Sequence, residues 1–524
     1  MTIRIAHISD THATSGKEFI ESSYNIMAET VNMSGADLVV HTGDITAGGL
    51  KEEFPLAKRL LGKIRTPMVV LIGNHDSRNV GALLFEEYIG PTRGVHTDDE
   101  LGLFLVYVDS TVPDQNDGRV GSIQFEWLHH QLIEHQHYAH KVVALHHHLV
   151  PVPHAGRERN VLNNAGDMVD LFIKYDVDLV LCGHRHFPNV YRVEDMVISN
   201  AGCASCLKTR MGDINSYNWV ELGDGSMQVE VRRLDGDVVR YPRVRPAPNI
   251  FSVPSRRLMR IGHMAGTYLG IDTYEQAKFE NAARKLNSLS PDLVIHCGNI
   301  VSQGSKTDYA VATKELGRIK APMMFTPGPR DLNYLGYYLF PNHFGYQWQM
   351  MEMDDVFIQG IATAQYDSEV GVVGDWGRKE LAGLLREHMD KFRVVYLHHN
   401  IVPIPKIRGR GLLEDAGDLL ELFVHEGVDL VLTGCSSHPS TLRVEGTLFI
   451  NANTVSAKLH RTPFGCSYNL VDVFEDIIMV QEVHSLWGSR RTLGVWPRKP
   501  VGPPKDLPEG RKRTRRELLV GRIR

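Results

Sequence analysis

The chain of 524 residues lacks several features that would define its class at once. It has no run of about 18 or more apolar residues, so a transmembrane helix is not expected. Its first residues, MTIRIAHISDTH, lack the charged leader, apolar core and small-residue cleavage site of a secretory signal. Its 57 basic and 62 acidic residues give no overall attraction to nucleic acid or to anionic membranes. We therefore expect a cytoplasmic globular protein without a membrane partner.

Cysteine is also scarce. Six cysteines in a chain of this length do not make a disulfide framework. Cys203 and Cys206 form one CxxC, but no second pair at matching spacing completes a zinc ribbon. We interpret the cysteines as reduced structural thiols, and a metal or redox role is the alternative.

The sequence contains two copies of one unit. The matching blocks are RIAHISDTHA and RIGHMAGTYL, ADLVVHTGDITAGG and PDLVIHCGNIVSQG, TPMVVLIGNHD and APMMFTPGPRD, VVALHHHLVPVP and VVYLHHNIVPIP, and NAGDMVDLFIKYDVDLVLCGH and DAGDLLELFVHEGVDLVLTGC. Their offset changes only from 256 residues, between Asp10 and Gly266, to 251 residues, between His184 and Cys435. Blocks that keep their order and spacing in this way indicate a tandem duplication.

Changes in composition indicate where the copies begin and end. Prolines and arginines replace apolar periodicity in residues 235–257, which predicts a linker between a first domain, 1–234, and a second, 258–496. Residues 497–524 are rich in proline and glycine and then basic. We interpret them as a solvated, partly disordered tail, and an arm that binds nucleic acid or a partner is the alternative.

Short β-rich runs such as IRIAHIS and DLVVHTG alternate in each copy with amphipathic segments such as FIESSYNIMAETVNMSG. This alternation predicts a layered α/β fold. The β-rich runs end in polar residues, and chemistry in such folds collects at the carboxyl ends of strands.

Five strand ends of the first copy carry side chains that bind metals. They are Asp10 and His12, Asp44, Asn74 and His75, His146, and His184 and His186. Carboxylate, amide and imidazole groups suit divalent manganese, iron, zinc or cobalt. Without His75 the set has seven members, too many for one tetrahedral ion, so we expect two ions that share a carboxylate. Two ions roughly 3.5–4 Å apart can activate a bridging water and clamp a phosphoryl group during in-line displacement.

The sequence resembles the calcineurin-like metallophosphoesterases at these residues. The ordered motifs D-x-H, G-D, G-N-H-D/E, H and G-H-x-H are complete between residues 10 and 186. The resemblance implies a four-layer α/β/β/α sandwich, present twice in tandem, and a dinuclear metal site in the first copy.

The resemblance also implies a role for each residue. Asp10, His12 and His186 would bind the first metal, Asp44 would bridge, and Asn74, His146 and His184 would bind the second. His75 would stabilise phosphoryl charge or protonate the leaving group. Asp76 would orient His75 or would be a structural turn carboxylate. Among three adjacent histidines, His146, His147 and His148, the usual H-H-P-P form of the block favours His146.

The second copy has lost this set. The seven ligand positions correspond to Gly266, Tyr268, Asn299, Pro329, His398, Cys435 and Ser437. Arg330 stands where the first copy has His75. A dinuclear site cannot be rebuilt from these residues, so we interpret the second copy as a pseudo-enzyme domain. A single-metal site made of Cys297, His398 and Cys435 is the alternative.

Hydrolysis of a phosphate ester is the function that the resemblance implies. Short insertions, the N-H-D form and the LHHH block are most similar to the cyclic-nucleotide and glycerophosphodiester phosphodiesterases, which attack a diester in line with a metal-bridging hydroxide. A nuclease, a phosphomonoesterase and a scaffold that binds nucleic acid or a partner are alternatives, and nucleic acid is not favoured. The second copy would form an intramolecular pseudo-dimer with the first, and a further homo-oligomer is compatible with this.

Overall fold

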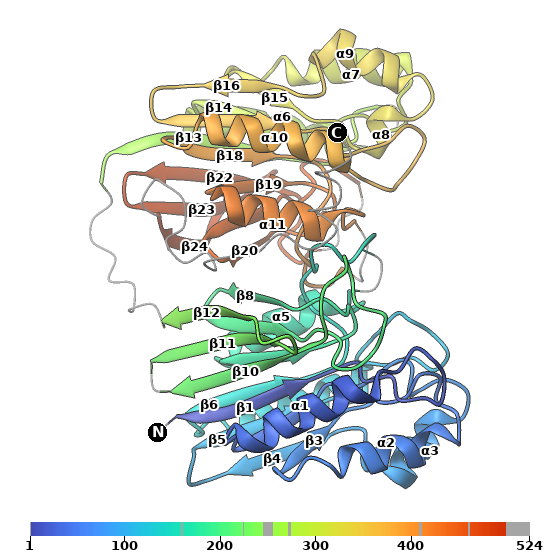
Figure 1. Cartoon of the computed structure of the whole chain (residues 1–524). Coiled ribbons are helices and arrows are strands. Elements are labelled where there is room, and N and C mark those ends of the chain that lie inside the picture. Colours follow the sequence, from blue (N-terminus) through green and yellow to red (C-terminus); the bar gives the residue numbers. More distant parts are fainter. Residues whose placement is uncertain are drawn as a thin grey trace. The chain divides into compact units, whose positions relative to one another are not determined.

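The computed structural model describes residues 2–158, 161–223, 225–244, 255–270, 274–407, 411–458 and 462–498. The chain divides into two compact units, Met1–Ala247 and Pro248–Pro504 (Figure 1). Strand β12 (Val238–Val244) pairs with its neighbour inside the segment for which composition predicts a linker. Most of the predicted tail, from residue 499, lies outside the described residues.

Two six-stranded arrays form the first unit. One has the order β12, β11 (Ser226–Arg233), β10 (Ser216–Gly223), β1 (Ile3–Ile8), β2 (Leu38–His41) and β3 (Met68–Val70). The other has the order β4 (Gly94–Asp98), β5 (Leu103–Tyr107), β6 (His140–Ala144), β7 (Leu179–Cys182), β9 (Met196–Asn200) and β8 (Asn189–Val193). Strands β1 to β3 are parallel, and so are β5, β6, β7 and β9. The carboxyl ends of these parallel strands carry the candidate ligands.

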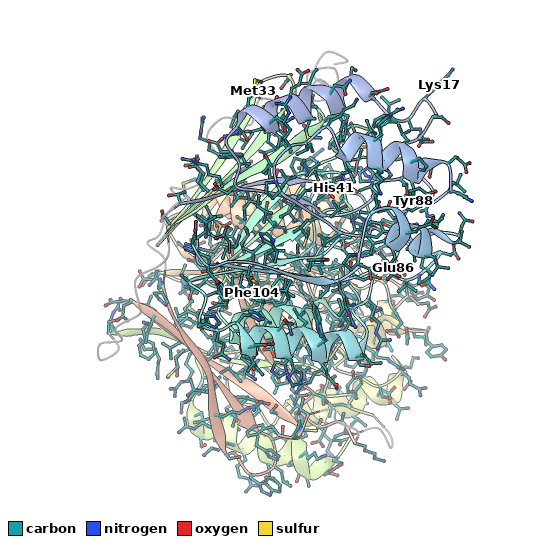
Figure 2. All side chains as sticks on the ribbon, turned by 90° about the horizontal axis from the view of Figure 1, so that it is seen from below. Lys17, Met33, His41, Glu86, Tyr88 and Phe104 are labelled. Carbon is teal, nitrogen blue, oxygen red and sulfur yellow. A yellow bond between two sulfur atoms is a disulfide. The ribbon has the colours of Figure 1, made fainter. Side chains whose placement is uncertain are left out.

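Helices cover the outer faces of the arrays. They are α1 (Glu21–Met33), α2 (Glu53–Leu61), α3 (Gly81–Tyr88), α4 (Ser122–Glu134) and α5 (Ala165–Lys174). Helix α1 buries Tyr24, Met27, Ala28 and Val31, a spacing that places all four on one face. One hydrophobic cluster contains residues of the helices α1, α2 and α3 and of the strands β1 and β2. A second cluster fills the space between the two arrays. In Figure 2 Met33 reaches the surface of this unit, whereas Phe104 lies inside it.

The second unit repeats this plan. One array has the order β15 (Met323–Phe325), β14 (Leu293–His296), β13 (Arg257–Met264), β22 (Ser467–Phe474), β23 (Ile477–His484) and β24 (Arg490–Pro497). The other has the order β16 (Met350–Glu352), β17 (Val356–Gly360), β18 (Phe392–Tyr396), β19 (Leu430–Thr433), β21 (Thr447–Asn451) and β20 (Ser440–Val444). Its helices are α6 (Gln276–Leu289), α7 (Lys306–Leu316), α8 (Pro329–Leu332), α9 (Gly336–Phe344), α10 (Gly374–Glu387) and α11 (Ala416–Glu426). The layered α/β sandwich is therefore present twice in tandem, as the sequence predicts.

Among the described residues, we find no helix with the length and apolar character needed to cross a membrane.

Buried histidines make the second unit sensitive to acid. His263 and His296 are fully buried; their Nε2 atoms lie 3.0 Å from Thr433 O and from Thr267 Oγ1. Burial lowers the pKa of each to about 3. In the unfolded chain histidine titrates near pH 6.5, so below about this pH the unfolded chain binds more protons than the folded one. The stability that these neutral rings contribute is complete above about pH 6.5 and is lost as the pH falls towards 3.

We expect His263→Gln to weaken this acid dependence. The free energy of unfolding of the unaltered chain should fall as the pH is lowered from about 6 to about 4. In the variant the slope of this fall should be smaller by up to about 1.4 kcal/mol per pH unit. Urea unfolding at several pH values measures it. His425→Gln, at an exposed position of α11, should keep the original slope. Equal slopes for both variants would contradict a neutral buried His263.

Candidate metal centre

Left-handed turns place most of the candidate ligands. The backbone φ angle is positive at Asp10 (53°), His12 (50°), Asp44 (56°), His184 (74°) and His186 (54°). Each such residue costs on the order of 1–2 kcal/mol, so the surrounding structure has to hold it. Backbone bonds between the first two strand ends do so: Asp10 N–H donates to Gly43 O (3.0 Å) and His12 N–H to Asp44 O (2.9 Å).

Glycines in the motifs let the strand ends approach one another. A Cβ on Gly73 would lie 2.2 Å from the backbone nitrogen and from Oδ1 of Asp44. A Cβ on Gly183 would lie 1.9 Å from Ser9 Oγ and 2.9 Å from Asp10 Oδ2. The glycines of G-N-H and G-H-x-H are therefore required by close packing around the carboxylates.

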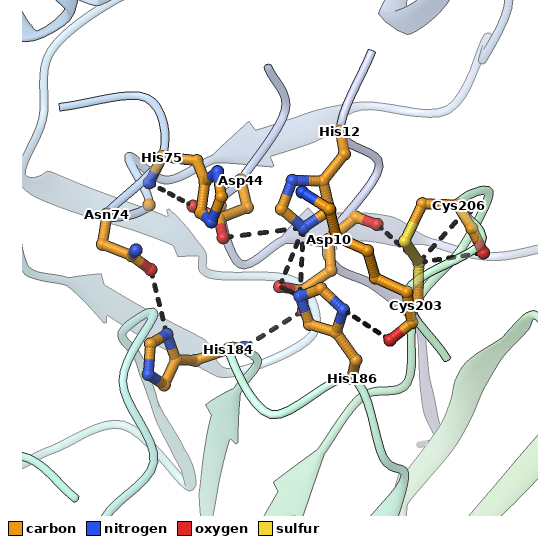
Figure 3. A network of polar contacts seen from close by, with 12 residues as sticks. Asp10, His12, Asp44, Asn74, His75, His184, His186, Cys203 and Cys206 are labelled. Atoms are coloured by element: carbon orange, nitrogen blue, oxygen red, sulfur yellow. Dashed lines mark hydrogen bonds and ion pairs between the residues drawn. A yellow bond between two sulfur atoms is a disulfide. The ribbon is translucent and has the colours of Figure 1, made fainter. Parts of the chain in front are cut away.

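The first group of ligands consists of Asp10, His12, Asp44 and His186 (Figure 3). All four are buried, and their ligand atoms lie within 4.8 Å of one another. The Nε2 atoms of His12 and His186 are 3.0 Å apart, and His186 Nε2 is 3.2 Å from Asp10 Oδ1. His12 Nε2 lies 3.7 Å from Asp44 Oδ2.

The second group meets at Asn74. Its Oδ1 lies 3.0 Å from His146 Nε2 and 2.9 Å from His184 Nδ1. His146 Nε2 is also 3.5 Å from Asp44 Oδ2, the same oxygen that faces His12 in the first group. Ligands about 2.1 Å from one ion lie roughly 3 Å apart, so both groups fit a divalent metal with Asp44 between them.

Backbone carbonyls orient two of the imidazoles. Nδ1 of His146 donates to Thr42 O (2.7 Å), and Nδ1 of His186 donates to Lys208 O (3.1 Å). A carbonyl can only accept, so Nδ1 carries a proton and Nε2 is the ring atom that faces the ligand group. Sequence reasoning misses these carbonyls because any residue type can supply one.

The electrostatics of the groups suit metal binding. Burial raises the pKa of Asp10, but the His186 imidazole outweighs it and the pKa falls to about 2. Burial holds the pKa values of His12 and His184 well below the ordinary range, so both rings are neutral. Burial also lowers the pKa of His146, but Asp44 raises it to about 9, so a metal at this ring displaces a proton.

The three adjacent histidines point to different partners. His146 faces Asn74 and Asp44, as described. His147 contacts Ser110 Oγ through Nδ1 (2.8 Å), and His148 Nε2 lies 3.0 Å from the buried Glu158 carboxylate. These contacts favour His146 as the ligand.

The predicted catalytic residues, His75 and Asp76, differ in position. His75 N–H donates to Asp44 Oδ1 (2.8 Å), and its ring lies edge-on to His12 with centroids 4.7 Å apart. The Asp76 carboxylate is buried and accepts backbone N–H bonds from Ile45 (3.1 Å), Thr46 (2.7 Å) and Gly73 (2.9 Å). Asp76 has the contacts of a structural turn carboxylate, the alternative to orienting His75.

Asn116 is a neighbour of the centre that carries no motif. Its Oδ1 accepts from Asn74 Nδ2 (3.3 Å) and from Arg78 Nη2 (2.8 Å), which orients the Asn74 amide so that Oδ1 faces the histidines. Asn116 lies in an irregular loop 42 residues after Asn74, so no local pattern could have identified it.

Tyr268 fills the corresponding place in the second unit. Asn299 Nδ2 lies 3.4 Å from the Tyr268 hydroxyl, and that hydroxyl also hydrogen-bonds the Ser437 side chain. A Cβ on Gly266 would lie 3.1 Å from the Tyr268 ring, so loss of the Asp10 side chain makes room for the ring that replaces His12. Gly266, Tyr268, Asn299 and Ser437 keep the positive φ angles of their counterparts. The second unit has retained the backbone of the site and replaced its chemistry.

The cysteines correct one expectation. Cys203 and Cys206 form a disulfide, so the expectation that the cysteines are reduced thiols is wrong for this pair. The CxxC spacing in the sequence does not by itself show whether the two sulfurs are close enough to bond. Cys182, Cys297, Cys435 and Cys466 are free. Among the described residues the group near His398 consists of His398, His399 and Cys435, so the proposed set with Cys297 does not assemble.

Comparison with known proteins identifies the family of the chain. The sequence pattern of the calcineurin-like phosphoesterases matches residues 3–188 and again residues 259–434. The chain belongs to the calcineurin-like phosphoesterase family. It is therefore a metal-dependent phosphoesterase. The family uses a dinuclear divalent-metal site, and the first unit contains a buried group of Asp and His residues that could hold a metal ion.

Two curated relatives match over about 200 residues. The 3′,5′-cyclic adenosine monophosphate phosphodiesterase CpdA of Escherichia coli is 28% identical over 35% of this chain and 70% of its own length. A probable glycerophosphodiester phosphodiesterase GpdQ of Arcobacter nitrofigilis is 30% identical over 35% of this chain and 71% of its own. A solved structure of a dimetal phosphatase from Danio rerio is 10% identical, with a TM-score of 0.39, over 45% of this chain and 99% of that one.

We expect Gly73→Ala to disable the metal centre. The equivalent substitution in the second unit, Gly328→Ala, should leave the metal centre intact. The new Cβ would displace Asp44, and a shift of about 1 Å at a reacting centre costs on the order of 100-fold in rate. Gly328→Ala makes the same clash with Asn299, so both variants should lose about 1–3 kcal/mol of stability. Metal content and phosphoesterase activity of the purified variants are the measurements. An active Gly73→Ala variant would show that Asp44 need not hold its position.

Proposed function

We propose that the first unit hydrolyses a small phosphodiester with two divalent ions. Asp10, His12 and His186 would hold one ion, Asn74, His146 and His184 the other, and Asp44 both. The single observation that carries the proposal is the Asp44 Oδ2 atom, 3.7 Å from His12 Nε2 and 3.5 Å from His146 Nε2. Two curated relatives are named for cyclic-nucleotide and glycerophosphodiester hydrolysis, which supports a diester of that size.

When bound, two divalent ions neutralise phosphoryl oxygens and supply a nucleophilic water. His75 adds a proton donor beside them. Its Nδ1 donates to Ala47 O (2.6 Å) and its backbone N–H to Asp44 Oδ1, so the ring is fixed from two sides. A proton on Nε2, towards the leaving oxygen or a phosphoryl oxygen, would require the imidazolium form of the ring; burial lowers the pKa of His75, and the Asp44 carboxylate partly offsets this.

The second unit would take no part in catalysis. Tyr268 stands at the position of His12, and Arg330 stands at the position of His75. We propose that it acts as a scaffold, in an intramolecular pseudo-dimer with the first unit. The identity of the metals and a cytoplasmic location stay predictions.

Activity should depend on the first unit alone. With added manganese, the chain should hydrolyse bis(p-nitrophenyl) phosphate faster than p-nitrophenyl phosphate. His75→Ala should reduce turnover by about 100- to 10,000-fold, the usual contribution of general acid–base catalysis, and Asp44→Ala should abolish it. The matched variants Arg330→Ala and Asn299→Ala should keep full activity.

Faster turnover of the monoester would instead identify a phosphomonoesterase, and cleavage of single-stranded DNA or RNA would identify a nuclease. Loss of activity in Arg330→Ala would contradict a non-catalytic second unit.

Metal analysis should find two ions per chain. The second unit retains only His398 of the seven ligand positions, which is too few for a dinuclear site. Elemental analysis of the purified full chain measures the ratio, and Asp44→Ala should lower it. Four ions per chain would contradict the assignment of one centre to the first unit.

A further inference from the structure

The Cys203–Cys206 pair lies directly against the first group of ligands (Figure 3). The Cys206 sulfur and ring nitrogens of His12 and His186 lie within 4.8 Å of one another, and all three residues are buried. The Cys203 sulfur lies 3.0 Å from Asp10 O. The sulfur pair therefore contacts the backbone of one proposed ligand and lies within 4.8 Å of the ring nitrogens of two others.

Backbone bonds hold the cysteines in this position. Ala204 N–H donates to Ser9 O (3.1 Å), Ile20 N–H to Ser205 O (2.7 Å) and Leu207 N–H to Glu18 O (2.9 Å). The segment is thus fastened to the turn that carries Asp10 and His12. A change at the sulfurs acts next to the ligands because the segment stays anchored there.

The second unit shows that this turn folds without cysteine. Thr454 and Ala457 occupy the equivalent positions. Cys206 forms an isolated backbone β-bridge with Phe19, and Ala457 forms the same kind of bridge with Tyr274. Ala457 N–H donates to Thr454 Oγ1 at 3.2 Å, the distance between Cys206 N and the Cys203 sulfur. Thr454 Oγ1 in turn donates to Gly266 O. The cysteines are present where the ligands are and absent where the ligands are lost, so the turn itself does not explain them.

We propose that Cys203 and Cys206 form a redox switch on the first metal position. In the dithiol form Cys206 would supply a sulfur ligand beside His12 and His186; in the disulfide form that ligand is withdrawn. The inference rests on the proposed ligand set. A dithiol reductant supplies two electrons and two protons, its own sulfurs join, and the Cys203–Cys206 bond breaks into two thiols.

The added ligand changes which metal the position prefers. The Cys206 thiol gives up its proton when it binds, and the resulting thiolate is softer than carboxylate or imidazole oxygen and nitrogen donors. Reduction would therefore strengthen binding of zinc or cobalt relative to manganese. Exchange with an oxidised dithiol, whose disulfide takes up the two electrons and two protons, would reverse this.

Cobalt titration of the metal-free full chain tests the switch, before and after reduction with dithiothreitol, which itself binds cobalt and is therefore removed in the absence of air before the metal is added. Visible ligand-field absorption should appear in both forms, because Asp10, His12 and His186 are unchanged. A near-ultraviolet thiolate-to-cobalt band should appear only in the reduced form. Cobalt affinity, from competition with a chelator, should rise by about tenfold or more on reduction, the scale on which a changed ligand environment acts.

Substitutions taken from the second unit provide matched variants that its turn already accommodates. Cys206→Ala should lack the thiolate band in both forms. Cys203→Thr leaves Cys206 without a disulfide partner, so its band should appear without reductant. Cys435→Ser should keep the band. This would show that the band does not arise from the group of His398, His399 and Cys435.

Two results would overturn the switch: a reduced chain without the thiolate band, or a band that persists in Cys206→Ala. Absence of visible cobalt absorption in both forms is a different failure, because it would overturn the proposed ligand set and the inference with it. Visible absorption without a thiolate band would reject the switch and leave the proposed function standing.

Discussion

Two carboxylates and four imidazoles converge in the first unit at a largely buried place, where five of these side chains are buried and His184 is partly exposed. Buried charges cost several kcal/mol each unless partners surround them. Asp44 meets this requirement from both sides, since one oxygen accepts the His75 N–H and the other faces His12 and His146. Left-handed turns, close-packed glycines and the backbone bonds to Asp76 serve to hold this carboxylate in place.

The second unit separates the requirements of the fold from those of chemistry. Asp331 accepts backbone N–H bonds from Ile300, Val301 and Gly328, although the second unit retains only His398 of the seven ligand positions. Asp76 accepts equivalent bonds in the first unit. Four ligand positions keep their left-handed backbone without a ligand. The turn geometry is therefore a property of the sandwich, and metal chemistry depends on the side chains that these turns present.

Loss of the second site involved compensating changes. The Tyr268 ring needs the space that Gly266 leaves, and its hydroxyl satisfies Asn299 and Ser437. Restoring one ligand alone would create a clash or leave a buried polar group without a partner, which costs about 1–3 kcal/mol. This packing explains how the second unit remains well folded after losing the charges that organise the first.

The amino-acid sequence by itself determined the duplication, the layered α/β class and the residue types at each strand end, because these are local patterns that recur in order. It also located the loss of ligands in the second copy. Only the tertiary structure decided that His146 faces Asp44, that Asp76 braces two turns, that Asn116 orients Asn74 and that Cys206 lies beside His186. These contacts join residues far apart in the chain, and the packing of two sheets, which no local pattern encodes, sets their distances.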